Sequence, residues 1–274
     1  MASNAPGACC FLGVKHEGTP SGQKIKVGGV DAYVAEPAAD TEHKDVAILY
    51  LPDVFGIWAN SQLLADQFAA NGYYTLIVDP FKGDAFDPDA ERPKDFDINK
   101  WLAQGTSGDN PHTPEAVDPI VVDALRFLKQ DKGFKKVGAL GYCFGAKYVV
   151  RHYKSGIDVG YMAHPSFVEE AELAGIAGPL SIAAAEVDHI FPTEKRHKSE
   201  EILIKTGQPW QINLYSGVSH GFAVRGDMED QKARFAKEQA FIQAVAWFNE
   251  HLKVPEPSVV RPKAHNASCH VFHA

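Results

Sequence analysis

The chain has 274 residues, of which 45% are hydrophobic and 23% charged, so it can bury a sizeable core. A formal net charge of −8 argues against a nucleic-acid partner, because such binders need a basic patch. No apolar run is long enough for a membrane span, and the first residues lack the pattern of a signal peptide. We therefore expect a soluble cytoplasmic protein, a monomer or small homo-oligomer, with no membrane or nucleic-acid partner.

Four cysteines are too few for a disulfide framework in a chain of this length, and two of them are adjacent and can hardly bridge each other. A metal site at the two chain ends is one alternative, with the candidate ligands Cys9, Cys10, Cys269, His270 and His273. Their spacing matches no zinc pattern. We expect no metal and no cofactor.

Strand and helix patterns alternate along the first half of the chain. The stretch "KIKVGGVDAYVAEP" predicts two strands joined by a turn at Gly28 and Gly29. Apolar runs at 46–51 and 74–78 predict strands that are buried on both faces, and helical spacing between them predicts a helix that ends at Asn71-Gly72. Residues 82–112 are polar, with an amphipathic island around Trp101, and predict a long excursion over an edge of the domain.

The alternation continues through the second half. Further strands are predicted at 137–140, 159–163, 180–185 and 211–215, and helices at 116–130, 144–154, 193–205 and about 228–251. In the first of these helices, Val121, Val122, Leu125 and Leu128 are expected to share one face. The whole pattern predicts an α/β fold whose central sheet is mostly parallel and covered by helices on both sides.

We expect a single domain over residues 1–253, in which about the first 25 residues are peripheral. A polar, Pro-rich tail follows over 254–274.

The stretch "GYCFG" places Cys143 between Gly141 and Gly145, where a strand pattern changes to a helix pattern. This is the cysteine form of the nucleophile elbow, a strained turn that requires small residues on both sides. The turn would also leave Cys143 at a helix N-terminus, where the backbone N–H groups favour a thiolate and an oxyanion. The alternative is a buried structural cysteine beside a tight turn.

An elbow of this architecture needs an acid and then a histidine further along the chain. Asp188 follows the strand in "LSIAAAEVDH", and His220 follows the next strand, in "YSGVSHGF". Because both follow the carboxyl ends of strands, their side chains should meet at one edge of the sheet. Three competitors stand at similar positions, Glu186, His189 and His164.

At this point the chain resembles the dienelactone hydrolases of the α/β-hydrolase superfamily. The resemblance covers residues 46–251 and rests on five motifs in order: "PDVFGIW", "VDPF", "GYCFGA", "EVDHIFP" and "SHGFAVRGD". It implies the α/β-hydrolase fold and a triad of Cys143 as nucleophile, His220 as base and Asp188 as the group that orients the histidine. The oxyanion would bind the amides of Val54 and Phe144.

The resemblance also implies the substrate class, a small lactone or carboxylic ester that passes through an acyl-thioester, as in a carboxymethylenebutenolidase. Asp53 stands where the family usually has a glutamate that contacts the resting thiol, and it is one methylene shorter. Arg225 is the counterpart of an arginine that binds the lactone carboxylate. Aromatic residues are expected to line the substrate pocket or to belong to the ordinary core; these are Phe55, Trp58, Tyr142, Phe144 and Phe222.

Two rival functions stay open at this stage. A cysteine amidotransferase-like enzyme shares the elbow but needs a late His-Pro-Glu triplet, whereas His164-Pro165 is followed here by Ser166. A non-catalytic binding or stress-related protein could keep the elbow as a scaffold.

Overall fold

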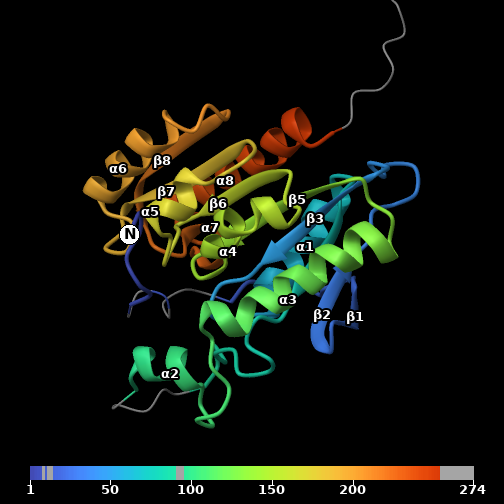
Figure 1. Cartoon of the computed structure of the whole chain (residues 1–274), viewed down its shortest axis with the longest axis horizontal. Coiled ribbons are helices and arrows are strands. Elements are labelled where there is room, and N and C mark those ends of the chain that lie inside the picture. Colours follow the sequence, from blue (N-terminus) through green and yellow to red (C-terminus); the bar gives the residue numbers. More distant parts are fainter. Residues whose placement is uncertain (8–9, 11–14, 91–95, 254–274) are drawn as a thin grey trace, which may run out of the picture.

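One eight-stranded sheet organises the chain, in the order β1-β2-β4-β3-β5-β6-β7-β8. The structure is a computed structural model that describes residues 1–7, 10, 15–90 and 96–253 (Figure 1). The strands are β1 (Gln23–Val27), β2 (Val30–Ala35), β3 (Val46–Leu51), β4 (Tyr74–Val78), β5 (Lys136–Tyr142), β6 (Val159–Ala163), β7 (Leu180–Val187) and β8 (Trp210–Ser219). The proposed tail over 254–274 and the ligand candidates Cys9, Cys269, His270 and His273 lie outside the described residues.

The sheet is mixed but mostly parallel, as the alternation predicted. β1 pairs antiparallel with β2, and β2 pairs antiparallel with β4, while the pairs from β4 through β3 to β8 are parallel. Gly28 and Gly29 both have positive φ (58° and 84°) and form the tight turn between β1 and β2. The sequence predicted a turn at these two glycines.

Helices connect the parallel strands and extend beyond them: α1 (Ala59–Ala70), α2 (Ile98–Gln104), α3 (Pro114–Arg126), α4 (Gly145–Arg151), α5 (Glu170–Ala174), α6 (Thr193–Leu203), α7 (Phe222–Arg225) and α8 (Gln231–His251). α3 continues into one π-helical turn, Phe127–Asp131. The two short helices α5 and α7 were not predicted. None of the described helices is long and apolar enough to cross a membrane.

The helices cover both faces of the sheet (Figure 1). The chain passes from β3 to β4 in one direction across the sheet and from β4 to β5 and β6 in the other, so right-handed crossovers place α1 opposite α3 and α4. α8 lies on the side of α1, where the Phe68 ring packs 4.8 Å from Phe241 and 6.4 Å from Phe248. On the other side Arg151 of α4 binds Asp118 of α3.

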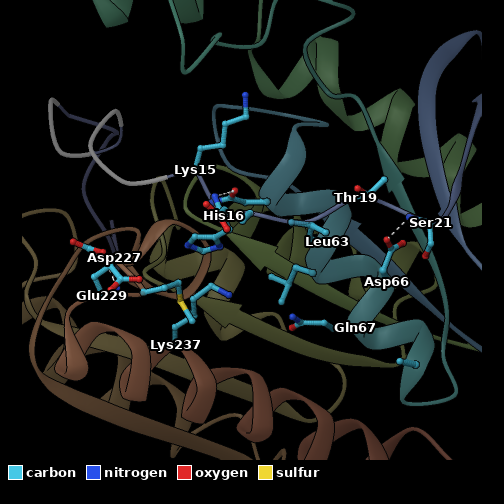
Figure 2. Close-up of a pocket in the computed structure, with 15 residues that line it drawn as sticks. Lys15, His16, Thr19, Ser21, Leu63, Asp66, Gln67, Asp227, Glu229 and Lys237 are labelled. Carbon is cyan, nitrogen blue, oxygen red and sulfur yellow. Dashed lines mark hydrogen bonds between the residues drawn. The ribbon is translucent and has the colours of Figure 1, made fainter.

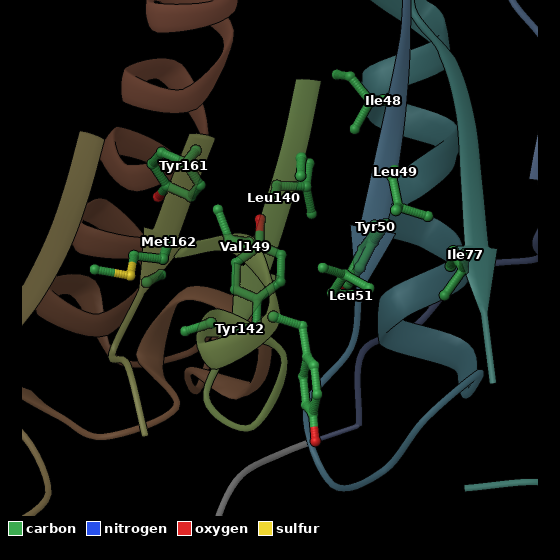
Figure 3. Packing of buried hydrophobic residues seen from close by; sticks show 14 of the residues in the cluster. Ile48, Leu49, Tyr50, Leu51, Ile77, Leu140, Tyr142, Val149, Tyr161 and Met162 are labelled. Atoms are coloured by element: carbon green, nitrogen blue, oxygen red, sulfur yellow. The ribbon is translucent and has the colours of Figure 1, made fainter. Parts of the chain in front are cut away.

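The core lies between these layers. Every residue of β3 and β4 is buried, which explains why their sequences are almost unbroken apolar runs. Figure 3 shows side chains of β3, β4, β5 and β6 packed side by side. In α3 the expected apolar face is wrong at Val122, which is 45% exposed, whereas Val121 and Leu125 are buried, as is Leu128 in the π-helical turn that follows.

The N-terminal segment corrects a further prediction. About 25 residues were expected to be peripheral, but Ala2, Ser3 and Cys10 are buried. The amides of Ala2 and Ser3 donate to the carbonyl of Val168, and the Asn4 amide donates to that of Ile190. Residues 1–7 therefore lie across the loops that follow β6 and β7, at the carboxyl edge of the sheet.

Candidate active site

Cys143 occupies a sharp turn between β5 and α4, with a φ of 50°. This left-handed conformation is costly for a residue with a side chain and is found where a structure fixes the backbone around a functional group. A Cβ on Gly141 would lie 2.7 Å from the carbonyl oxygen of Gly145, and a Cβ on Gly145 would overlap the carbonyl of Leu51. The two glycines are therefore required by the backbone around the elbow.

Asp188 and His220 meet in front of this turn, as the chain order predicted. Nδ1 of His220 lies 2.9 Å from Oδ2 of Asp188, and both side chains are buried. The other oxygen, Oδ1, accepts hydrogen bonds from the amides of Ile190 (2.8 Å) and Phe191 (3.0 Å). Glu186 is exposed and accepts a bond from a backbone amide of β8, so it is Asp188 that reaches the histidine.

The sulfur of Cys143 is fully buried and has two polar neighbours that sequence reasoning missed. The Cys10 thiol lies 3.3 Å away, and the Ser166 hydroxyl also lies 3.3 Å away. Cys10 Sγ lies in turn 3.6 Å from Nε2 of His220, and the two sulfurs and a ring nitrogen of the histidine lie within 4.8 Å of one another. Two thiols and an imidazole are donors that zinc prefers, so Cys10, Cys143 and His220 could hold a metal ion.

The electrostatics of the site favour a thiolate beside an imidazolium. Burial raises the pKa of Cys143, but the hydrogen bond from Cys10 and the charge of His220 together bring this pKa well below its ordinary value. Burial lowers the pKa of His220, but the Cys143 thiolate and the hydrogen bond with Asp188 raise it to about 10. Each partner therefore stabilises the charged form of the other.

Asp53 and Arg225 form a second buried pair at the site. Nη1 of Arg225 donates to Oδ2 of Asp53, and both side chains are 1% exposed. Burial raises the pKa of Asp53, with the Arg225 charge acting against this rise. The carboxylate also accepts the amide of Phe55, whose ring lies 5.2 Å from the guanidinium. Arg225 was expected to bind a substrate carboxylate, and in this structure its guanidinium pairs with the carboxylate of Asp53, which was expected to contact the thiol.

The two amides expected to bind an oxyanion belong to neighbouring segments. Phe144 directly follows the nucleophile, and Val54 lies just after β3. Both residues are buried. A Cβ on Gly145 would lie 2.8 Å from the carbonyl of Pro52, so the chain after β3 passes close to the elbow. This proximity is compatible with two N–H groups that converge on one oxygen.

His164, one of the competing histidines, lies close to His220 without the contacts of a base. It is fully buried, has a φ of 39°, and its ring centroid is 4.9 Å from that of His220. Neither ring nitrogen has a hydrogen-bond partner among the described residues. Burial keeps the pKa of His164 well below its ordinary value, so the ring is neutral. His189 is exposed.

The aromatic residues expected in a substrate pocket are all buried but fall into different surroundings. Tyr142 packs against Tyr50 and other rings of the core, and Phe222 packs against His164. Phe55 and Trp58 pack against each other, with ring centroids 4.9 Å apart.

Phe144 borders a cavity of about 380 Å³ next to the elbow, and the sequence did not point to the other residues around it. These include Met1, Leu102, Lys147, Tyr148 and Phe167. A second cavity, of about 670 Å³, lies elsewhere, between residues 15–21, α1 and the start of α8, and no triad candidate lines it (Figure 2). The smaller cavity is lined by no triad candidate either, and it adjoins the elbow through Phe144.

Comparison with known proteins agrees with this fold. A sequence model of the dienelactone hydrolase family matches residues 30–252. The chain is 50% identical to hydrolase tropI of Talaromyces stipitatus, over 92% of this chain and 99% of that protein. It is 35% identical to dienlactone hydrolase 1 of Gibberella moniliformis, over 88% of this chain and 92% of that protein.

Solved structures show the same architecture. A putative dienelactone hydrolase from Klebsiella pneumoniae superposes with a TM-score of 0.67 at 16% identity, over 84% of this chain and 98% of that one. The protein is thus an α/β hydrolase by fold. More narrowly, it belongs to the dienelactone hydrolase family, as the five motifs indicated.

Proposed function

We propose that this hydrolase cleaves a small lactone or carboxylic ester through a Cys143–His220–Asp188 triad. The observation that carries the proposal is the arrangement at the elbow. A strained, buried cysteine lies beside a histidine whose far nitrogen is 2.9 Å from a buried carboxylate. A scaffold cysteine needs neither the strain nor this partner, whereas a nucleophile needs both.

In the proposed mechanism the proton of Cys143 already resides on His220, and Asp188 fixes the ring with Nδ1 as donor. The thiolate attacks the substrate carbonyl, and the amides of Val54 and Phe144 stabilise the oxyanion. His220 gives its proton to the leaving alkoxide as the acyl-thioester forms. The neutral ring then takes a proton from water, which attacks the thioester, releases the acid and restores the thiolate.

Arg225 bears on the class of substrate. The guanidinium of Arg225 can bind the carboxylate of an anionic lactone, as the resemblance to the family implied. In this state Asp53 already neutralises its charge. A substrate carboxylate would therefore have to take the place of Asp53. We propose that anionic substrates displace Asp53 from Arg225 and that neutral esters leave the pair intact. The aromatic side chains predicted to contact the substrate remain Phe55, Trp58, Tyr142 and Phe222.

The test is a panel of lactones, aryl esters and thioesters, assayed with the wild type, Cys143→Ala and His220→Ala. We expect hydrolysis of at least one lactone or ester by the wild type and none above background with either variant. Covalent labelling of Cys143 by a small electrophile gives a second readout, and it should become much slower in His220→Ala. Labelling that does not depend on His220, together with no hydrolysis by the wild type, would favour the scaffold alternative.

A further inference from the structure

The proposed mechanism makes no use of Cys10, although its thiol contacts the nucleophile. The two sulfurs are 3.3 Å apart, and Cys10 Sγ also lies 3.6 Å from the ring of His220. Both cysteines are fully buried. Because a disulfide bond is about 2.05 Å long, the sulfurs need to approach by only about 1.3 Å to form one.

Residues 3 and 4, which precede Cys10 by only a few positions, are hydrogen-bonded to loops that lie far along the chain. The amide of Phe167 donates to the carbonyl of Asn4, and the Asn4 amide donates to Ile190 in the loop after Asp188. The hydroxyl of Ser3 accepts the amide of Val168. Residues 3 and 4 are therefore anchored on the loops after β6 and β7, at the edge of the sheet where Cys10 contacts the elbow.

We propose that Cys10 and Cys143 form an oxidative modification site, in which Cys10 is the resolving thiol for the nucleophile. The Cys143 thiolate attacks one oxygen of hydrogen peroxide, the O–O bond breaks, and Cys143 becomes a sulfenic acid. The hydroxide that leaves takes the proton of the His220 imidazolium and becomes water. The Cys10 sulfur then attacks the sulfenic sulfur. A Cys10–Cys143 disulfide forms, and the sulfenic oxygen leaves as a second water. The two thiols thereby supply the two electrons that reduce the peroxide.

The surroundings suit both steps. His220, whose ring nitrogen lies within 4.8 Å of both sulfurs, holds the proton of Cys143 before the first step. Once it has given that proton to the leaving hydroxide, the neutral ring lies 3.6 Å from Cys10 and can accept the proton that this thiol loses. Burial of both sulfurs restricts the oxidant to a small hydroperoxide. The disulfide would block hydrolysis, because the nucleophile is bonded, and would prevent further oxidation of Cys143 to an irreversible acid.

The test uses full-length reduced protein with a chelator present, so that no metal occupies the thiols. Wild type, Cys10→Ser and the matched control Cys9→Ser are treated with hydrogen peroxide, the remaining thiols are alkylated, and peptides are mapped by mass spectrometry without reduction. We expect a cross-linked peptide pair containing Cys10 and Cys143 in the wild type. In Cys9→Ser the same Cys10–Cys143 bond should form.

Activity before oxidation serves as each variant's own reference. Dithiothreitol should restore nearly all of the initial rate in the wild type and in Cys9→Ser. In Cys10→Ser we expect sulfinic or sulfonic acid at Cys143 and a loss of activity that dithiothreitol does not reverse. A cross-link formed by another cysteine, or equal recovery of Cys10→Ser and wild type, would overturn the proposal.

This inference rests on the proposed function only for its activity readout. If the protein hydrolyses no ester but the Cys10–Cys143 peptide pair forms, the proposed function fails and the modification site stands. If hydrolysis depends on Cys143 and no such pair forms, the reverse holds.

Discussion

Replacing Asp188 by Asn tests the triad most directly, because the structure dictates how the new side chain must lie. The amides of Ile190 and Phe191 both donate to Oδ1, so the Asn carbonyl has to stay in that position. Its NH₂ group then faces Nδ1 of His220, which can only accept. The ring proton is forced onto Nε2, and the loss of the carboxylate also lowers the pKa of His220.

Cys143 would then face the N–H group of a neutral His220. In this tautomer the ring nitrogen next to Cys143 cannot take up and release the proton during the reaction. Loss of the correct tautomer costs about 10⁴ in kcat in comparable triads, which is about 5.5 kcal/mol on the activation barrier. The fold should lose far less, because the two amide bonds persist and only a charge-assisted bond, worth about 1.5 to 3 kcal/mol, is weakened.

Steady-state hydrolysis and urea denaturation measure the two effects separately. The matched control is Glu186→Gln, at an exposed position near the end of β7 and two residues before Asp188, which should change kcat by less than about twofold. Nearly normal turnover in Asp188→Asn, with a large loss in Glu186→Gln, would refute the assignment of the acid. Equal losses of rate and of folding in Asp188→Asn would mean that Asp188 acts by holding the loop.

Four further predictions follow from the same site. Cys143→Ala should abolish hydrolysis while changing the free energy of unfolding by only about 1 kcal/mol, since little volume is removed; retained turnover would exclude the triad. Arg225→Ala should cost about 3 to 5 kcal/mol of stability in urea denaturation, because it leaves the buried Asp53 charge unpaired, and adding Asp53→Asn should recover much of this loss; an unchanged midpoint in the single variant would contradict it. A profile of kcat/KM against pH should be bell-shaped. The alkaline limb should lie near pH 10, where His220 loses its proton. The acid limb should lie below the ordinary pKa of a cysteine, where Cys143 gains a proton. A kcat/KM that only rises with pH, through the ordinary cysteine pKa, would rule out the ion pair. Gly145→Ala should destabilise by about 1 to 3 kcal/mol or more in the same denaturation assay, since its methyl group would overlap backbone rather than a movable side chain, and a tolerated substitution would contradict the rigid elbow.

The same ionisations predict how stability depends on pH. His220 has a higher pKa in the folded chain than in the unfolded one, so its contribution is present below the ordinary histidine pKa and lost as pH rises through about 10. Cys143 has a lower pKa when folded, so its contribution is lost as pH falls through that lowered value.

Most of the fold could be predicted because each main element carries its own local signal. The strands β3 and β4 are buried on both faces and read as unbroken apolar runs, and α1 ends where Asn71-Gly72 indicated. The helices α5 and α7 were missed because five and four residues are too few to display a helical period. Val122 was wrongly placed on the buried face of α3. Sequence spacing alone predicted an apolar face wider than the part of the helix that packs against the sheet.

Positions within the site could be predicted only where topology fixes them. Cys143, Asp188 and His220 each follow a strand of the parallel sheet, so their order along the chain implied that they would meet at one edge. The partner of Arg225, Asp53, follows a different strand, β3, and lies 172 residues away along the chain. Local pattern gave no reason to prefer Asp53.

Cys10 belongs to no predicted element, and its contact with Cys143 joins residues 133 positions apart. Among the described residues, the backbone amides of Ala2, Ser3 and Asn4 donate to the loops after β6 and β7, and side chains add further contacts, such as the bond from the Asn4 side-chain amide to the carbonyl of His189. Backbone hydrogen bonds of this kind cannot be predicted from residue type, because every residue except proline can donate its amide. Cys143 is fully buried in this state, so substrate has to displace part of what covers it.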